Sequence, residues 1–209
     1  MLKKFAVGLI MLFTLGLAHA QPKVGVEYRE LATPQPTDNA AKVEVLEFFW
    51  YGCPHCYNFE PTLDPWLKKL PKDVEFRRIP AMFNDEYAQG ARAFYALEAI
   101  GEEQRLHKAL FDAVHTGSHL KVSNEAALTE WLGKQGVDLK KFAAAYRSFS
   151  VEGKLKRAAQ FTQSYKIEGV PAMAVNGKYV VITDAIKSFD QLLSITDYLI
   201  EQSRKKGAK

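Results

Sequence analysis

The feature that most constrains the fold of this chain is an apolar segment that leads directly into two closely spaced cysteines. Residues Lys42–Trp50 read KVEVLEFFW, and Cys53–Cys56 (CPHC) follows after two further residues. Apart from its acids the segment is apolar on both faces, which is typical of a strand buried within a sheet. The pattern then predicts a helix to about Leu70 and another strand at Asp73–Pro80. Because such a strand–helix–strand unit pairs its strands in parallel, we expect an α/β fold.

The second half of the chain is divided by its hydrophobic pattern into helices and one hairpin. From residue 84 to 150 apolar residues recur at helical spacing without a strand pattern. Either Ser123 or Asn124, and further along Asp138, can act as helix N-caps. A further helix is expected at about Gly153–Lys166. Two strands joined at Asn176-Gly177, a strong hairpin signal, and a final amphipathic helix follow.

The first twenty residues have the pattern of a secretory signal peptide. Lys3 and Lys4 precede an apolar run from Phe5 to Leu17, and Ala18-His19-Ala20 supplies a small-x-small cleavage site. The alternative is an uncleaved membrane anchor, but spanning a bilayer takes about 20 apolar residues, more than this run provides. We therefore expect cleavage after Ala20 and export from the cytosol.

The charge balance gives no case for binding nucleic acid. The formal net charge is +4, and the leader carries two of the lysines and no acid, so the mature chain is nearly neutral. Proteins that bind the phosphate backbone of nucleic acids usually carry a strongly basic face.

Cys53 and Cys56 are the two cysteines of the chain, and their position points to redox chemistry. With Pro54 and His55 between them, both sulfurs can lie on one helical turn and close a small disulfide ring. The preceding strand places Cys53 at a helix N-terminus, where free N–H groups and the helix dipole stabilise a thiolate. His55 can add a donor or a positive charge, and Pro54 has the φ that a first turn requires. A stabilised thiolate makes the disulfide easier to reduce, so the pair is expected to give its disulfide away.

Three other uses of the cysteines compete with this interpretation. A structural disulfide is common in exported proteins, although closing so small a ring removes little chain entropy. A zinc site needs four ligands as a rule, and the spaced pair His115 and His119 lies in a glycine-containing segment far from Cys56. Covalent haem attachment requires a histidine directly after the second cysteine, where Tyr57 stands. We expect neither a metal nor a cofactor.

Glu47 is an acid at a position where the strand pattern predicts an apolar side chain. It alternates with Val43 and Val45 and is therefore expected to point into the core, shortly before Cys53. One interpretation is a shift in register that leaves Glu47 in solvent. The other is a buried acid beneath the disulfide, with a raised pKa, that relays protons when Cys56 acts as acid or leaving group.

Taken together, the leader, the cysteine segment and a later hairpin resemble the DsbA family of bacterial periplasmic thiol–disulfide oxidoreductases. The likeness is carried by VLEFFWYGCPHC, which ends at Cys56, by the helical stretch, and by GVPAMAVNGKY, which ends at Tyr179, and it covers essentially the whole mature chain. It implies a thioredoxin fold, residues 21–83 and 151–209, with an inserted α-helical domain at 84–150. It also implies a periplasmic location and an oxidase that introduces disulfides into secreted proteins.

The resemblance further implies roles for individual residues around the cysteines. Pro171 is expected to be a cis-proline that faces the disulfide, and the backbone of Val170 to pair with an extended substrate strand. An apolar groove for unfolded substrates is expected from Trp50, Tyr51, Met82, Phe83 and Met173, although each of these can equally pack in the core. A lysine is expected to pair with Glu47, but Phe76, Arg77 and Arg78 stand there, so its partner stays open.

The reaction expected from these residues is a two-step exchange. A thiolate of an unfolded exported protein attacks Cys53, Cys56 leaves, and a second substrate thiolate resolves the mixed disulfide. By family likeness, a membrane quinone-linked oxidase of the DsbB type restores the disulfide, and the protein acts as a monomer.

Two other functions are considered. A disulfide isomerase or reductase is one, but well-known periplasmic isomerases dimerise through a separate N-terminal domain. Residues 21–41, read as an extended arm with a short edge strand near Val26–Leu31, are too few for such a domain. The other is a chaperone-like binding module with incidental cysteines, which predicts that a double Cys→Ala variant keeps full function.

Overall fold

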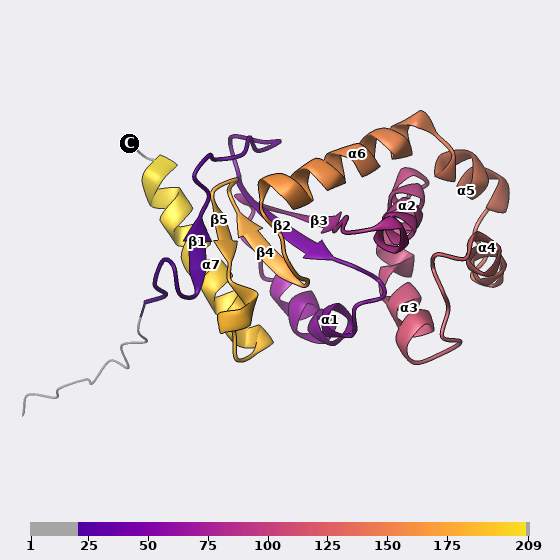
Figure 1. Ribbon diagram of the computed structural model, residues 1–209, viewed down its shortest axis with the longest axis horizontal. Helices are drawn as coiled ribbons and strands as arrows, with labels where there is room; N and C mark the ends of the chain where they lie inside the picture. Colours follow the sequence, from indigo (N-terminus) through magenta and orange to yellow (C-terminus); the bar gives the residue numbers. More distant parts are fainter. Residues whose placement is uncertain (1–20, 208–209) are drawn as a thin grey trace, which may run out of the picture.

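The computed structural model describes residues 21–207, which form a 5-stranded mixed sheet with helices on both faces (Figure 1). The expected signal peptide, residues 1–20, lies outside the described residues. The strand order is β1-β5-β4-β2-β3, with β2 parallel to β3 and the other neighbours antiparallel. The strands are β1 (Tyr28–Glu30), β2 (Val43–Phe49), β3 (Val74–Pro80), β4 (Ala172–Val175) and β5 (Tyr179–Val181). The expected parallel strand–helix–strand unit is thus confirmed.

The helices divide between the sheet and a group at one end of it. In Figure 1, α1 lies below the sheet, α6 lies above it and α7 runs along its left side, whereas α2 to α5 gather at the right. The helices are α1 (Pro54–Leu67), α2 (Asp85–Ala99), α3 (Glu103–His115), α4 (Glu125–Lys134), α5 (Leu139–Tyr146), α6 (Phe149–Ser164) and α7 (Phe189–Gly207), with a short 3₁₀ turn at Thr183–Ala185. None of the described helices combines the length and the apolar character that a bilayer crossing requires.

The alternation of β2 separates two apolar cores. Val43 and Val45 point toward α1 and α7, where they pack with Phe59 and Leu63 of α1. The intervening side chains face α6 and the helical group, as the contact between Phe48 and Tyr165 shows. All seven residues of β2 are buried, as expected for a strand within the sheet. Glu47 lies on the α1 face, which places an acid directly in an apolar layer.

The final hairpin turns at the predicted Asn176-Gly177 pair. Both residues have positive φ, 52° and 65°, and the N–H of Lys178 donates to the Val175 oxygen at 3.0 Å. A Cβ at position 177 would lie 2.0 Å from the backbone oxygen of Gln35, so this turn requires glycine. The arm that precedes β2 therefore packs against the turn, with the Gln35 N–H donating to the Gly177 oxygen.

One helix begins earlier than the sequence pattern indicates. The pattern places its start near Gly153, but α6 begins at Phe149, with the Ser148 hydroxyl accepting from the Val151 N–H at 3.2 Å. A serine N-cap explains this start, because its side chain satisfies a backbone donor that the first turn leaves unpaired. Of Ser123 and Asn124, the structure selects Asn124, which accepts from the Ala127 N–H at 3.1 Å.

Candidate active site

Cys53 is the N-cap of α1, where the end of β2 delivers it. Its backbone is extended (φ −86°, ψ 115°), Pro54 follows in the first helical turn, and the Cys56 N–H donates to Cys53 Sγ at 3.3 Å. The sulfur thus takes the place of the hydroxyl or carboxylate oxygen that usually caps a helix. Both cysteines are free thiols in the structure. The expected placement of Cys53 at a helix N-terminus is confirmed.

The two sulfurs have opposite acid strengths because of where they lie. A hydrogen bond from the Cys56 side chain, aided by the Cys56 and His55 backbone N–H groups and the charge of His55, lowers the pKa of Cys53 to about 6. Burial raises the pKa of Cys56 well above its ordinary value. Cys53 is partly exposed, whereas Cys56 has 0% of its surface exposed. The outer sulfur is therefore the one that holds negative charge at neutral pH and that another molecule can reach.

The segment before β4 passes beside Cys53, as the resemblance implies. The Val170–Pro171 peptide bond is cis, and the Val170 oxygen lies 3.3 Å from Cys53 Sγ, which donates to it when the thiol is protonated. Pro171 is buried and has no N–H, so it places no backbone donor next to the thiolate.

A cavity of about 510 Å³ opens beside this segment. His55 borders it on one side, Val170 and Pro171 on another, and the segment after β5 closes it with Thr183, Asp184, Ile186, Lys187 and Phe189. These last residues could not be recognised from the sequence. Their apolar members look the same in sequence whether they line a groove or fill a core, and the segment carries no distinguishing motif.

The prediction of an apolar groove is wrong for two of the residues assigned to it. Met173 is 0% exposed, because its position on β4 opposite Glu47 directs it into the core beneath α7. Tyr51 is 1% exposed and packs against Phe111. Trp50 is partly exposed and stacks on Tyr87 with ring centroids 4.2 Å apart, so it lies on the surface near the cysteines.

Glu47 is fully buried, as the strand alternation predicts, and its partner is Arg78 of β3. Glu47 Oε2 lies 3.2 Å from Arg78 Nε, but neither oxygen of Glu47 makes a hydrogen bond of acceptable geometry within the described residues. Burial raises the pKa of Glu47 to about 8, against the opposing charge of Arg78. The carboxyl beneath Cys56 is therefore protonated at neutral pH.

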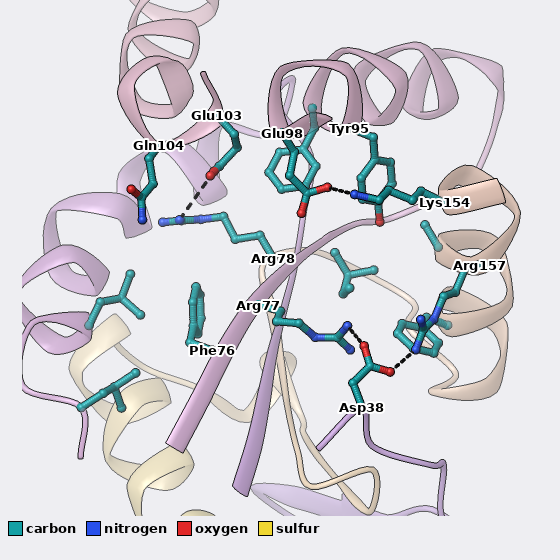
Figure 2. A pocket seen from close by; sticks show the side chains of 16 residues that line it. Asp38, Phe76, Arg77, Arg78, Tyr95, Glu98, Glu103, Gln104, Lys154 and Arg157 are labelled. Carbon is teal, nitrogen blue, oxygen red and sulfur yellow. Dashed lines mark hydrogen bonds and ion pairs between the residues drawn. The ribbon is translucent and has the colours of Figure 1, made fainter. Parts of the chain in front are cut away.

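Arg78 holds two further carboxylates at the boundary between the sheet and the helical group. Its Nη2 lies 3.2 Å from Glu60 Oε2 on α1, and its Nη1 lies 4.0 Å from Glu103 Oε1 on α3. Figure 2 shows Arg78 extending from β3 to Glu103 on the wall of a cavity of about 570 Å³, whose other wall carries the Arg77–Asp38–Arg157 ion pairs. The cavity gives solvent access to the end of the cluster that lies away from the cysteines.

His107 of α3 completes this cluster, and it could not be recognised from the sequence. Its Nδ1 lies 2.9 Å from the Tyr51 hydroxyl and its Nε2 lies 3.4 Å from Glu60 Oε1. Burial lowers the pKa of His107 to about 4, so the ring is neutral at pH 7. A histidine within an amphipathic helix carries no signal of its own, because its partners come from segments that are distant in sequence.

The spaced histidines considered for zinc make other contacts. His115 Nε2 donates to the Tyr51 backbone oxygen at 2.8 Å, and its ring stacks on Tyr57. No group of three or more histidine, cysteine, aspartate or glutamate residues within the described part of the chain is arranged to hold a metal ion.

Comparison with known proteins decides the family. A family model described as a DSBA-like thioredoxin domain matches residues 71–194. The thiol:disulfide interchange protein DsbA of Pseudomonas aeruginosa is 42% identical over 185 residues, covering 88% of this chain and 87% of that protein. The protein of the same name from Azotobacter vinelandii is 41% identical over 212 residues, covering 97% of this chain and 99% of that protein. The chain belongs to the DsbA family.

The solved structures of the DsbA family agree with this assignment. The crystal structure of Pseudomonas aeruginosa DsbA matches with a TM-score of 0.84 and 42% identity, over 88% of this chain and 96% of that chain. The α/β fold is therefore a thioredoxin fold with an inserted helical domain, as the sequence analysis expected. As a DsbA family member, the chain is a protein disulfide oxidoreductase.

Proposed function

We propose that this DsbA family member donates a disulfide between Cys53 and Cys56 to newly exported proteins, through a mixed disulfide on Cys53. The observation that supports this most is the contrast between the two sulfurs: Cys53 is reachable and has a pKa of about 6, whereas Cys56 is buried and has a raised pKa. An incoming thiolate reaches Cys53, and the lower charge cost of a Cys53 thiolate makes the oxidised pair a strong electron acceptor.

The exchange proceeds in two balanced steps. A substrate thiolate attacks Cys53 Sγ and forms the mixed disulfide. The Cys53–Cys56 bond breaks, Cys56 keeps the electron pair of that bond, and Glu47 gives Cys56 a proton. A second substrate thiolate then attacks the substrate sulfur of the mixed disulfide. The substrate leaves with a new disulfide, two electrons have passed to the cysteine pair, and Cys53 remains as a thiolate.

The surroundings of Cys53 would hold and favour the substrate in this scheme. The backbone groups of Val170 pair with an extended substrate segment, and the adjoining cavity and the partly exposed Trp50 receive its apolar side chains. Pro171 contributes a surface without a competing N–H. His55 and the N-terminal turn that begins at Pro54 stabilise the thiolate product.

The partners and location follow the family. Residues 1–20 direct export to the periplasm and are removed, leaving a thioredoxin-like domain of 21–83 and 151–209 around the inserted domain 84–150. Substrates are unfolded exported proteins with free thiols. A membrane quinone-linked oxidase of the DsbB type accepts the two electrons and restores the disulfide, and the protein acts as a monomer.

Substitution of each cysteine separates the two roles. Cys53→Ser is expected to abolish the oxidation of a reduced model protein, because no sulfur remains for the substrate to attack. Cys56→Ser is expected to retain attack on an activated disulfide and to accumulate mixed disulfides, detected as covalent adducts on non-reducing gels. Wild-type oxidation by the Cys56→Ser variant would show that the two-cysteine scheme is wrong.

A further inference from the structure

His107 is the point at which the helical group contacts the acids beneath the cysteine pair. The charged and titratable groups that face it come from every element packed around it: the Tyr51 hydroxyl after β2, Glu60 and Asp64 on α1, Arg78 on β3 and Glu103 one turn earlier on α3. Glu47 joins the cluster through Arg78, which it shares with Glu60. A residue of the inserted helices is thus connected to Glu47, the acid whose charge acts on Cys56.

The charges in this cluster do not balance unless protons are retained. Three carboxyls, Glu47, Glu60 and Glu103, face a single guanidinium, and His107 is neutral. Three ionised carboxylates around one cation would leave unpaired negative charge in a buried site, which is costly. The carboxyls therefore compete for Arg78, and a carboxyl that loses the competition keeps its proton.

His107 gives Glu60 an advantage in this competition. Burial raises the pKa of Glu60, but the hydrogen bond from His107 and the charge of Arg78 together outweigh burial, and the net pKa is lowered. Glu47 receives no such donor, since neither of its oxygens has a hydrogen-bond partner among the described residues. Glu60 is thus the ionised partner of Arg78 and Glu47 is the neutral one.

We propose that His107 is a positioning residue that holds the proton of this carboxyl pair on Glu47 rather than on Glu60. The inference rests on the proposed function, in which Glu47 supplies a proton to Cys56 as that sulfur leaves. His107 does not touch the cysteines. It acts by donating its Nε2–H to Glu60, so that Glu60 is the ionised carboxyl and Glu47 stays protonated.

Tyr51 fixes the tautomer of His107 that this role requires. A neutral imidazole carries one proton, and an ionised Glu60 can only accept a hydrogen bond. With the Tyr51 hydroxyl donating to Nδ1 at 2.9 Å, the ring proton resides on Nε2 and points at Glu60. Without that hydroxyl, the proton can move to Nδ1, which lies 3.6 Å from Glu103 Oε1. The hydrogen bond from the Tyr51 hydroxyl, just ahead of the cysteines, therefore controls which carboxyl accepts the ring N–H of His107.

The outer end of the cluster offers a source for the next proton. Glu103 and Arg78 line the cavity in Figure 2, and burial raises the pKa of Glu103, so this carboxyl keeps its proton to a higher pH than an exposed glutamate does. Solvent thus reaches the carboxyl cluster from the cavity side, away from the face where Cys53 lies.

The test is the titration of Glu47 in the purified reduced protein, followed by infrared difference spectroscopy of its carboxyl with Glu47→Gln as the reference. Wild type is expected to titrate near pH 8. In His107→Leu the midpoint is expected to fall by about one unit, because Glu60 gains proton occupancy and repels Glu47 less. His107→Gln, which keeps an amide N–H within reach of Glu60, is expected to restore most of the wild-type value.

Two further variants keep the test decisive if His107→Leu does not fold. Tyr51→Phe keeps the ring but removes the hydroxyl, and is expected to lower the Glu47 midpoint in the same direction. His115→Leu removes the other histidine of α3 that contacts Tyr51, through the backbone oxygen, and is expected to leave the midpoint unchanged. An unchanged midpoint in a folded His107→Leu or Tyr51→Phe protein overturns the inference, as does an equal shift in His115→Leu.

The titration needs no substrate, so its outcome is independent of the proposed oxidase reaction. A second measurement connects the two: the pH profile of single-turnover oxidation of a dithiol peptide. In His107→Leu the profile is expected to move to lower pH by the same amount as the Glu47 midpoint, with His107→Gln restoring it. A shifted midpoint with an unmoved profile would overturn the link from His107 to Cys56, while the cysteine variants would still decide the proposed function.

Discussion

At the scale of single residues, backbone position rather than residue type sets the chemistry of the two thiols. Cys53 and Cys56 are the same residue within one turn of α1, yet the pKa of the first falls to about 6 and that of the second rises. The first caps the helix and receives hydrogen bonds, whereas the second points inward above Glu47. Small changes in these local contacts should therefore be measurable as changes in thiol acidity.

His55 is expected to make a secondary contribution to the acidity of Cys53. In His55→Ala the pKa of Cys53 should rise by a fraction of a unit, because the hydrogen bond from Cys56 is the larger cause and the charge of His55 the smaller one. The ultraviolet absorbance of the thiolate against pH measures this. Asn58→Ala, at an exposed position in the next turn, serves as the control, and equal titrations for all three proteins would remove His55 from the scheme.

Glu47 is expected to make the protein less stable as the pH rises. Its pKa is about 8 in the folded protein and near 4.5 in an unperturbed glutamate, so between these pH values the unfolded chain releases a proton that the folded chain retains. Stability is fully present below about pH 4.5 and is lost as pH rises toward 8. Glu47→Gln should therefore be more stable than wild type at pH 7, by up to about 3 kcal/mol.

Urea unfolding at pH 4 and pH 7 measures this difference. The two proteins should differ little at pH 4, where Glu47 is protonated in both states. A Glu47→Gln variant that is no more stable than wild type at pH 7 would show that the buried carboxyl is ionised and well paired.

Residue positions could be predicted where alternation decides them and not where packing does. The alternation of β2 predicted that Glu47 points inward, and the structure confirms it. It could not identify Arg78 as the partner, because two arginines stand side by side on β3 and the side that each faces depends on the register of β3 against β2. Met173 was misplaced because a methionine near the cysteines suits a groove and a core equally well.

At the scale of secondary structure, local signals were reliable where they specify backbone geometry. The Asn176-Gly177 turn and the Asp138 cap, which accepts from the Lys140 and Lys141 N–H groups, both formed as expected. The start of α6 was misjudged because Phe149 is 97% exposed and gives no apolar periodicity, so Gly153 looked like the boundary. The Ser148 cap was the available signal.

Gly177→Ala is expected to destabilise the protein more than a similar change elsewhere. Its φ is 65° and an added Cβ would meet the backbone oxygen of Gln35 at 2.0 Å, so both the turn and the arm must shift. We expect a loss of about 2 kcal/mol or more. The control is Gly136→Ala, where φ is 77° but no atom lies within 4 Å, and only the backbone cost of about 1 kcal/mol applies. Equal losses in chemical denaturation would contradict the close approach of Gln35.

At the scale of the whole molecule, the order of motifs predicted the family but not how its parts meet. A CPHC segment, a helical stretch and a Val-Pro before a hairpin specify a thioredoxin fold with an insertion. They do not say which helix of the insertion packs against the cysteine-bearing helix. The structure brings α3 there, and His107 and Glu103 thereby reach groups on α1 and β3. Such contacts depend on tertiary packing, which leaves no periodic trace in sequence.

The reduced protein is expected to be more stable than the oxidised protein at pH 7. The folded dithiol form holds Cys53 with a pKa near 6 rather than 9, so stability of that form rises with pH across this window. The disulfide of the oxidised form closes a very small ring, so it adds little to the stability of that form. Urea unfolding with and without a reductant measures the gap, which should narrow below pH 6. A Cys53→Ala/Cys56→Ala protein should show no gap, and a more stable oxidised form would contradict the proposed direction of exchange.

The complete burial of Cys56 has a practical consequence for anyone who follows this protein in cells. A bulky maleimide added to the native protein can label only the outer sulfur, so each adduct counts one reduced molecule rather than one thiol. Two adducts per chain would instead report that the molecule had opened. A single gel lane therefore shows both the fraction of molecules that are reduced and the fraction that have unfolded.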